Sequence, residues 1–319
     1  MIRFASLAGA ALLVVATSAL AAWPERPIRI VVPLPAGTSP DLFARHVAQK
    51  LSARLKQPVI VENRPGANSV IGTAVVAKAN ADGYTLLNAS VQHVMLKPLL
   101  GKLEFDPDRD FIPVSTLSAT EMILVVPAAS RLSAVPDLVA AAKAKPGELN
   151  YATPGIGSPA HLAGQAFLSA YAVDVRHIPM KGSTESVTAV AGSQVDYTIT
   201  AASNALPLMQ AGKLRALVVA GARRHEMLPA VPTMKEALPP GFVYETWQAL
   251  FAPAGTPRAV VELLNAEVVR ILNETETREF FVKYGSSVRP RSLKDTGDFV
   301  REESKRAVEL VKAIGATAQ

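Results

Sequence analysis

Hydrophobic residues along this chain follow two periods, and the first is the pattern of strands buried inside a sheet. Residues 28–32 form an almost unbroken apolar run, and residues 59–61 and 84–87 form similar short runs. Short runs rich in valine, isoleucine and leucine that end at turn residues are typical of buried strands. We predict turns after the second run, at 63–66, and before the third, at 82–83.

The second period is that of an amphipathic helix. Apolar residues recur three or four positions apart within 41–55, at Ala44, Val47, Ala48, Leu51 and Leu55. This spacing places their side chains on one helix face. Residues 70–79 are predicted to be helical as well. Strands and helices that alternate in this way predict an α/β fold with a mostly parallel sheet covered on both faces.

The alternation restarts in the second half of the chain. We predict helices at 135–145 and 159–171 and strands at 122–126, 149–152, 173–178, 195–200 and 214–220. An extended segment follows at 242–251. From Arg258 the chain is predicted to be helical almost to its end, apart from a short strand at 287–289.

This order predicts two α/β lobes, because about 300 residues exceed one ordinary core. We assign residues 22–121 and 250–319 to the first lobe and 122–249 to the second. The chain then crosses between the lobes at 122–126 and 244–250, which predicts a hinge and a cleft. Ligands of open α/β sheets bind beyond the carboxyl ends of the strands, so the cleft is the expected site.

The N-terminus has the layout of a secretory signal. Arg3 is the only charged residue before Glu25, an apolar stretch covers 7–20, and Ala19-Leu20-Ala21 offers small residues for cleavage. We predict a cleaved signal peptide over 1–21 and a periplasmic mature protein. The alternative is a membrane anchor, but the apolar stretch is short and rich in alanine.

Composition narrows the classes of partner. The chain has no cysteine, so disulfides, thiol chemistry and a lipid anchor on cysteine are not expected. The formal net charge of +6 falls to +5 once Arg3 is removed, and this weakly positive field favours anionic ligands. Scattered basic residues and only 6% aromatic residues argue against a nucleic-acid surface.

Two loops between a strand and a helix are the candidate ligand-binding elements. They are residues 35–41, which include Ala36, Gly37, Thr38, Ser39 and Asp41, and residues 154–159, which include Gly155, Gly157 and Ser158. In both loops a Ser-Pro pair stands where the helix is expected to begin. Glycine allows close backbone approach, and a helix N-terminus attracts a carboxylate. The alternative is that both loops are simply well-capped helix starts.

Several polar side chains are further candidates, each with a structural alternative. Asp41 and His161 fall in first helical turns, where they have a capping or packing role in many proteins. Lys181 follows a strand and would neutralise a carboxylate or remain solvated. Ser90 and His93 follow the strand at 84–87, and the alternative for His93 is a surface loop.

Signatures of enzymes and metal sites are absent from the sequence. There is no G-x-S-x-G elbow, no H-E-x-x-H, no Walker loop and no G-x-G-x-x-G. The five histidines lack the spacing of metal ligands. Ser158 and His161 lie one turn apart, but no third group that would orient them is evident. We expect no enzyme activity, no cofactor and no metal.

At the level of whole segments, the sequence resembles the Bug family of extracytoplasmic solute receptors, the binding components of tripartite tricarboxylate transporters. The resemblance covers nearly the whole mature chain. It rests on the segments PERPIR at 24–29, VENRPGA at 61–67, ADGYTLL at 81–87, GELNYA at 147–152, HLAG at 161–164, AGKLRAL at 211–217 and FAPAGTP at 251–257.

This resemblance implies a type II periplasmic binding fold that holds a carboxylate ligand through loop backbone donors. By position it implies ligand contacts from the two loops above and from Lys181-Gly182. It also implies delivery to membrane permease subunits, and we expect a monomer. A receptor coupled to a signalling partner, or a periplasmic hydrolase or lyase on the same scaffold, is the alternative.

The sequence departs from the family pattern at three places. Thr38 replaces the second glycine of the first loop, Met180 replaces a tyrosine, and Thr200-Ala201 replaces an Asp-Asn pair. Without that aspartate, the ammonium of an amino acid would lack a partner. We therefore expect the site to include Thr200 and Ala201 and to reject amino acids. Met180 and Ala201 also remove polar groups, so we expect a carboxylate with an apolar or aromatic body. The alternative is that these three positions do not face the ligand.

Overall fold

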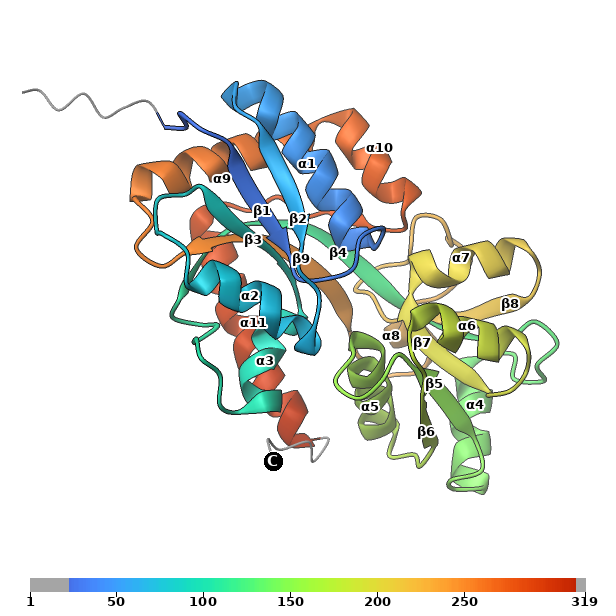
Figure 1. Cartoon of the computed structure of the whole chain (residues 1–319). Helices are drawn as coiled ribbons and strands as arrows, with labels where there is room; N and C mark the ends of the chain where they lie inside the picture. The colour runs from blue at the N-terminus through green and yellow to red at the C-terminus, as the bar shows by residue number, and fades with distance from the viewer. Residues whose placement is uncertain (1–22, 314–319) are drawn as a thin grey trace, which may run out of the picture.

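Two groups of strands and helices lie side by side in the computed structural model, which describes residues 23–313 (Figure 1). The predicted signal peptide at 1–21 lies outside the described residues. All strands belong to one continuous sheet in the order β2-β1-β3-β9-β4-β7-β5-β6, with β10 and β8 paired to β4. We call the group that contains β1 the first lobe and the group that contains β5 the second lobe.

The first lobe is built on three parallel strands. They are β1 (Ile28–Val32), β2 (Val59–Asn63) and β3 (Thr85–Ser90), with β1 in the centre. Its helices are α1 (Ser39–Leu55), α2 (Val70–Ala77), α3 (Gln92–Leu100), α9 (Arg258–Asn273), α10 (Thr275–Lys283) and α11 (Leu293–Ala313), with a short 3-10 helix η1 (Ala67–Ser69).

The apolar faces of these helices explain the layers of the first lobe. Helices α1, α9 and α10 pack on one face of the sheet, where Phe43 stacks on Phe281 with 4.1 Å between ring centroids. Helices α2, α3 and α11 cover the other face. Burying large apolar side chains such as these contributes about 1.5–3 kcal/mol each, so the sheet is fixed from both sides.

The second lobe repeats this arrangement. Its strands are β5 (Asn150–Thr153), β6 (Arg176–Pro179), β7 (Tyr197–Ala201) and β8 (Leu214–Val219). Helices α4 (Val135–Ala144), α5 (Pro159–Tyr171) and α8 (Met234–Ala237) contribute to one core cluster, and α6 (Ser183–Ala191) and α7 (Ala202–Gln210) to another. Tyr151 stacks on Tyr197 in its centre, at 5.6 Å.

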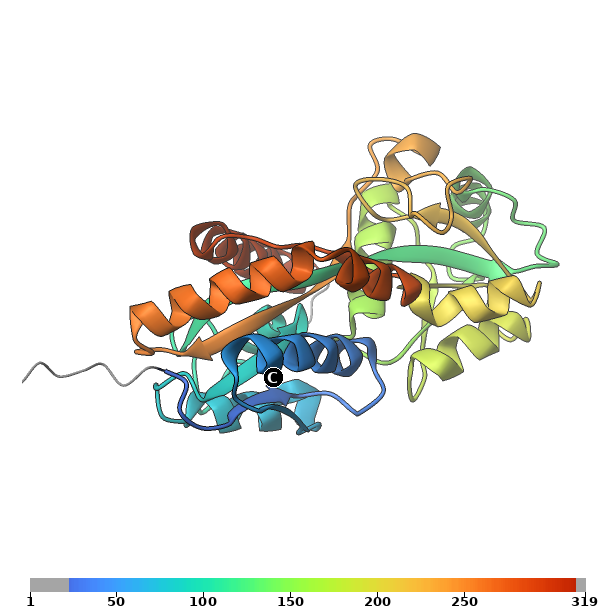
Figure 2. The same ribbon diagram turned by 90° about the horizontal axis from the view of Figure 1, so that it is seen from above.

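Strands β4 (Phe111–Pro127) and β9 (Glu245–Pro253) connect the two lobes, and β4 runs through both of them (Figure 2). β4 pairs with β9 from Phe111 to Glu121 and with β7 from Met122 onward. β4 changes its pairing partner between Glu121 and Met122, and β9 begins at Glu245. The lobe boundaries at 121/122 and 249/250 remain predictions.

The sheet is mixed rather than mostly parallel. The pairs β1–β2, β1–β3, β5–β6 and β5–β7 are parallel, whereas β4, β8, β9 and the short β10 (Ser287–Val288) make only antiparallel pairs. The antiparallel strands are the crossing strands and their neighbours. A chain that crosses between lobes twice must return in the opposite direction, and this explains the mixture.

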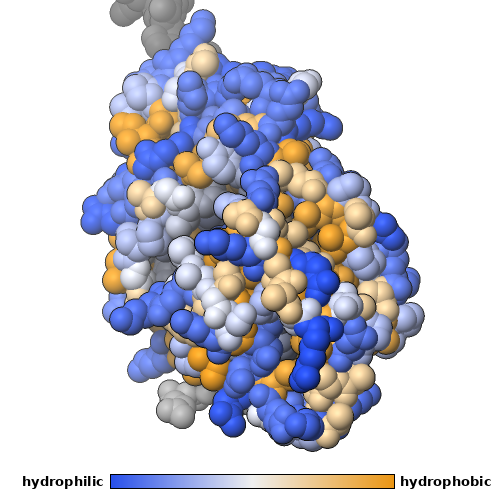
Figure 3. Space-filling model, turned by 90° about the vertical axis from the view of Figure 1, so that its right-hand side faces the viewer, coloured by the Kyte–Doolittle hydropathy of each residue, from blue (hydrophilic) through white to orange (hydrophobic). Residues whose placement is uncertain are grey.

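The face shown in Figure 3 is mostly hydrophilic, with hydrophobic residues scattered between polar ones. Across residues 23–313, no helix combines the length and apolar character needed to cross a bilayer.

Candidate ligand-binding cleft

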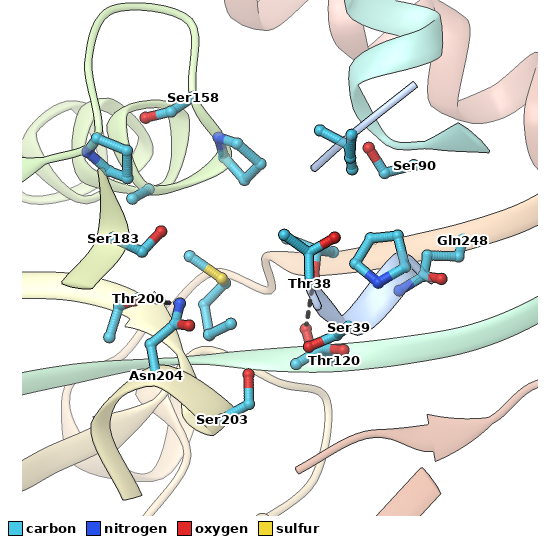
Figure 4. Close-up of a pocket in the computed structure, with 18 of the residues that line it drawn as sticks. Thr38, Ser39, Ser90, Thr120, Ser158, Ser183, Thr200, Ser203, Asn204 and Gln248 are labelled. Atoms are coloured by element: carbon cyan, nitrogen blue, oxygen red, sulfur yellow. Dashed lines mark hydrogen bonds between the residues drawn. The ribbon is translucent and has the colours of Figure 1, made fainter. Parts of the chain in front are cut away.

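A cavity of about 600 Å³ lies between the two lobes. Both lobes and both crossing strands contribute to its wall (Figure 4). The lining residues are Leu34, Gly37, Thr38, Ser39, Pro40, Leu42, Ser90, Gln92, Thr120, Met122, Pro154, Ser158, Pro159, Ala160, Ser183, Thr184, Thr200, Ala201, Ser203, Asn204, Thr246, Trp247, Gln248 and Tyr284. The volume suits a small organic ligand.

The crossing strands supply a polar wall of the cavity. Side chains alternate between the faces of a strand, so Thr120 and Met122 of β4 reach the cavity together with Thr246 and Gln248 of β9. Gln248 is only 5% exposed, and its Oε1 has no hydrogen-bond partner among the described residues. A buried amide without a partner is costly, so this group is available to a ligand or a water molecule.

The first-lobe loop places a helix N-terminus at the cavity. Thr38, not Ser39, is the N-cap of α1, and its hydroxyl donates to Pro35 O at 2.7 Å instead of capping the helix. The Gly37 N–H donates to Asp41 Oδ2 at 2.9 Å. Gly37 has φ +81°, a conformation that favours glycine.

The second-lobe loop has the cap that the sequence predicts. Ser158 is the N-cap of α5, where its Oγ accepts from the His161 N–H at 3.2 Å and donates to Gly155 O at 2.7 Å. The Gly157 N–H donates to His161 Nδ1 at 3.2 Å. Ser158 and His161 therefore meet through backbone and cap bonds, and their side chains do not form a nucleophile–base pair.

Two further helices of the second lobe begin at the cavity. Ser183 and Thr184 open α6, and Ser203 and Asn204 lie in the first turn of α7. Asn204 Nδ2 donates to Thr200 Oγ1 at 3.1 Å, which fixes its amide beside the end of β7 (Figure 4).

The electrostatic character of the cavity comes from backbone and not from charged side chains. In the described part of the chain, none of the lining residues carries a charged side chain. Helices α1, α3, α5, α6 and α7 all begin at the lining. Each N-terminus carries a partial positive charge of roughly half a unit, so the cavity is suited to an anion.

The structure brings seven of the predicted site residues to the cavity. These are Gly37, Thr38, Ser39, Ser90, Ser158, Thr200 and Ala201. Seven others lie outside its lining, namely Ala36, Asp41, His93, Gly155, Gly157, His161 and Lys181. Asp41, Gly155, Gly157 and His161 still belong to the two loops, whose conformation they determine through the bonds described above.

His93 is a buried core residue of α3 outside the cavity lining, so the surface-loop alternative is wrong. Its ring is 2% exposed and packs against Phe111 and Phe251, with centroids at 4.9 and 4.6 Å. Nε2 lies 3.0 Å from Pro107 O. Burial lowers the pKa of His93 to about 4, so the ring is neutral at pH 7.

Lys181 and Met180 lie apart from the lining. Lys181 is exposed, and its backbone N–H donates to Glu185 Oε2 at 2.7 Å. Met180 packs against the core of the second lobe. The methionine at the cavity is Met122 of β4.

The sequence interpretation missed the contributions of β4, β9, α6 and α7. Thr120, Thr246 and Gln248 are isolated polar residues in extended segments and carry no motif. The sequence nevertheless contained an indication of these residues, because strands predicted to cross between the lobes must border the cleft. Every second residue of such a strand must face the cleft. Ser183 and Asn204 follow strand ends, where ligand sites of α/β proteins lie.

Comparisons with protein-family models and with individual proteins point to the same family. The family model described as tripartite tricarboxylate transporter family receptor matches residues 43–316. Protein BugT of Bordetella pertussis is 35% identical over 310 residues, which cover 95% of each chain. A UPF0065 protein of a Pseudomonas species, encoded in the tcbD-tcbE intergenic region, is 36% identical over 310 residues, or 96% of this chain and 92% of that protein.

Solved structures with the same fold include ligand complexes. An R. palustris protein with adipate is 31% identical, with a TM-score of 0.82 over 92% of this chain and 98% of that one. MatC from Rhodopseudomonas palustris with bound malate is 32% identical, with a TM-score of 0.78 over 91% and 100%. The periplasmic binding protein BugD is 29% identical, with a TM-score of 0.79 over 93% and 100%.

Proposed function

This chain belongs to the tripartite tricarboxylate transporter receptor family, and we propose that its cleft captures a small aliphatic dicarboxylate. The family consists of solute-binding receptors. The observation that carries the proposed ligand class is the cavity wall, where five helix N-termini meet and no lining side chain is charged.

The charge of the wall supports a dianion. Five helix N-termini of roughly half a unit each sum to about 2.5 positive charges, of which the Asp41 carboxylate in the first turn of α1 offsets part. A dicarboxylate matches this charge better than a monocarboxylate does. Related proteins solved with adipate and malate, both dicarboxylates, provide independent support.

The lining also supports discrimination against amino acids. Thr200 and Ala201 reach the cavity, and no aspartate or glutamate stands beside them in the described wall. An ammonium group buried there would lack a counter-ion and would cost several kcal/mol. The hydroxyls of the wall can donate hydrogen bonds to the carboxylates of the ligand. The sequence suggested an apolar or aromatic ligand body on the basis of Met180 and Ala201. Ala201 lines the cavity and still supports it, whereas Met180 lies outside the lining.

The remaining parts of the proposal concern export of the protein, its oligomeric state and delivery of the ligand. We propose that the chain is exported by the signal peptide predicted at 1–21, acts as a monomer in the periplasm, and releases its ligand to permease subunits without turnover. The apolar stretch at the N-terminus and the similarity to the periplasmic binding protein BugD support this route.

A thermal-shift screen tests the ligand class. Succinate, adipate, malate and citrate are compared with aspartate, glutamate and benzoate. A ligand at 100 times its Kd should stabilise the protein by about 2.7 kcal/mol. Adipate or malate should give the largest shift, and mass spectrometry should find no new product.

The matched control is Asn204→Asp, which is isosteric and adds one negative charge to the wall. An acidic residue in the first turn of α7 is compatible with the helix dipole, so the fold should survive. The variant should lose the response to dicarboxylates. A response of the wild-type protein to aspartate or glutamate alone would contradict the proposed ligand class.

A further inference from the structure

The two cleft loops share a backbone arrangement that joins a glycine to the third residue of the following helix. In the first lobe, Gly37 precedes the N-cap Thr38, and its N–H donates to Asp41 at 2.9 Å. In the second lobe, Gly157 precedes the N-cap Ser158, and its N–H donates to His161 at 3.2 Å.

The backbone around the two glycines is nearly the same. Their φ angles are +81° and +77°, and both acceptor side chains are buried, Asp41 at 2% and His161 at 7% exposure. A capping box uses the same helix position, but there the side chain accepts from the N-cap residue itself. In these two loops the side chain accepts from the residue before the N-cap, so its hydrogen bond fixes the loop as well as the start of the helix.

We propose that Asp41 and His161 are equivalent positioning residues, which hold the two cleft loops against the ligand without touching it. Thr38 and Ser158, each between the tied glycine and the helix, then present their groups to the cavity in a fixed geometry. Because each glycine N–H is held by one side-chain acceptor, removal of that acceptor should loosen the loop at the glycine while the helix remains.

The acceptors Asp41 and His161 differ in charge, and the two lobes therefore differ in how strongly they attract an anion. Burial alone would raise the pKa of Asp41, but hydrogen bonds from Arg45, Gly37 and Asn63 hold it below its usual value, so the group is an anion. Its partner Arg45 lies 2.9 Å from Oδ1 and is half exposed. The carboxylate therefore offsets part of the positive end of α1.

His161 leaves the positive end of α5 intact. Burial lowers the pKa of His161 to about 4, and the neighbouring His177, whose ring centroid is 4.4 Å away, adds to this effect. Nδ1 must be unprotonated to accept from Gly157, so the neutral ring carries its proton on Nε2. We infer that the second lobe attracts the ligand carboxylate more strongly than the first.

Amide exchange tests the positioning role without any ligand. Solvent-exchange NMR at pH 7 compares the wild-type protein with Asp41→Ala, Asp41→Asn, His161→Ala and His161→Asn. Exchange of the Gly37 N–H should accelerate by about tenfold in Asp41→Ala, and that of Gly157 likewise in His161→Ala. Each asparagine variant should restore slow exchange, because its Oδ1 is an acceptor at the same position.

The pattern of rescue separates a positioning role from general packing. Equal exchange in the alanine variant and the wild-type protein would overturn the proposal. So would equal exchange in the alanine and asparagine variants when both melt at the wild-type temperature.

Titration with adipate tests whether the second lobe attracts the ligand carboxylate more strongly than the first. This test rests on the proposed function. Asp41→Asn should bind adipate a few-fold more tightly, and His161→Asp a few-fold more weakly, as expected for one charge that does not touch the ligand. An unchanged affinity in both variants would overturn this difference between the lobes. Failure of adipate, malate and succinate to bind to the wild-type protein would instead contradict the proposed ligand class, and the exchange rates would still decide the positioning role.

Discussion

Burial lowers the pKa of His93 and of His161, with a consequence for stability. The folded protein holds the pKa of His161 near 4, whereas the ordinary value is 6.5. Between these values the unfolded chain binds more protons than the folded one. The contribution of His161 is therefore complete above pH 6.5 and is lost as the pH falls toward 4. His93 behaves in the same way.

We predict that His161→Asn flattens the pH dependence of stability. The variant keeps the acceptor for Gly157 but binds no proton, so it should lose less stability between pH 7 and pH 4. The difference from the wild-type protein should be on the order of 2–3 kcal/mol at pH 4. Urea unfolding at a series of pH values measures it, and parallel curves for the two proteins would contradict the prediction.

At the residue scale, the sequence predicted backbone features of the site better than side-chain contacts. Gly37 and Ser158 were identified because turn and cap residues have local causes, whereas the predicted cap Ser39 is the first residue of α1 and Thr38 is its N-cap. Asp41 and His161 were predicted as ligand contacts with a capping or packing role as the alternative, and the structure places both outside the cavity lining with bonds to their own loops. His93 was misplaced because its neighbours Phe111 and Phe251 are far away in the chain.

At the level of elements, the strands with apolar composition were predicted and those with polar interiors were not. The first half of β4 buries Ser115, Thr116, Ser118 and Thr120, so it shows no apolar run, although its backbone is paired along its length with β9. Helices α3 and α7 contain Pro98 and Pro207, which obscure a helical pattern. For strand β4 and for these two helices, contacts with distant parts of the chain override the local preference of the sequence.

The two cleft loops offer a matched comparison at this scale. A Cβ at Gly37 would meet no atom within 4 Å, whereas a Cβ at Gly157 would lie 3.1 Å from Leu99 Cδ1 of the opposite lobe. The φ angles are nearly equal, so the backbone cost of alanine is the same at both positions, about 1 kcal/mol.

We predict that Gly157→Ala weakens adipate binding more than Gly37→Ala does. Both variants should lose similar stability from the left-handed backbone, but only the Gly157 variant pushes against α3 and keeps the lobes apart. Thermal melts and titration with adipate separate the two effects. Equal affinities for the two variants would show that the contact with Leu99 does not influence closure.

For the whole molecule, contacts between the lobes exist around the cavity and not only at the crossing strands. Gly157 approaches Leu99 on one side, and on the other side Gly285 of the first lobe lies against Ser203 of α7. His225 Nε2 also lies 3.4 Å from Gly285 O. The two-lobe arrangement was predictable from the repeated α/β pattern, but these contacts depend on the angle between the lobes, which no local pattern determines.

We predict that a dicarboxylate closes the lobes further. An anion that contacts helix N-termini of both lobes stabilises the closed arrangement over an open one, because only the closed form offers both sets of donors. A protein of this size has a radius of gyration of about 19 Å, and small-angle scattering should show a smaller value with saturating adipate. Asn204→Asp, which repels the anion, should keep the larger radius at the same adipate concentration. An unchanged radius of the wild-type protein at saturation would mean that the ligand enters a cleft that is already closed.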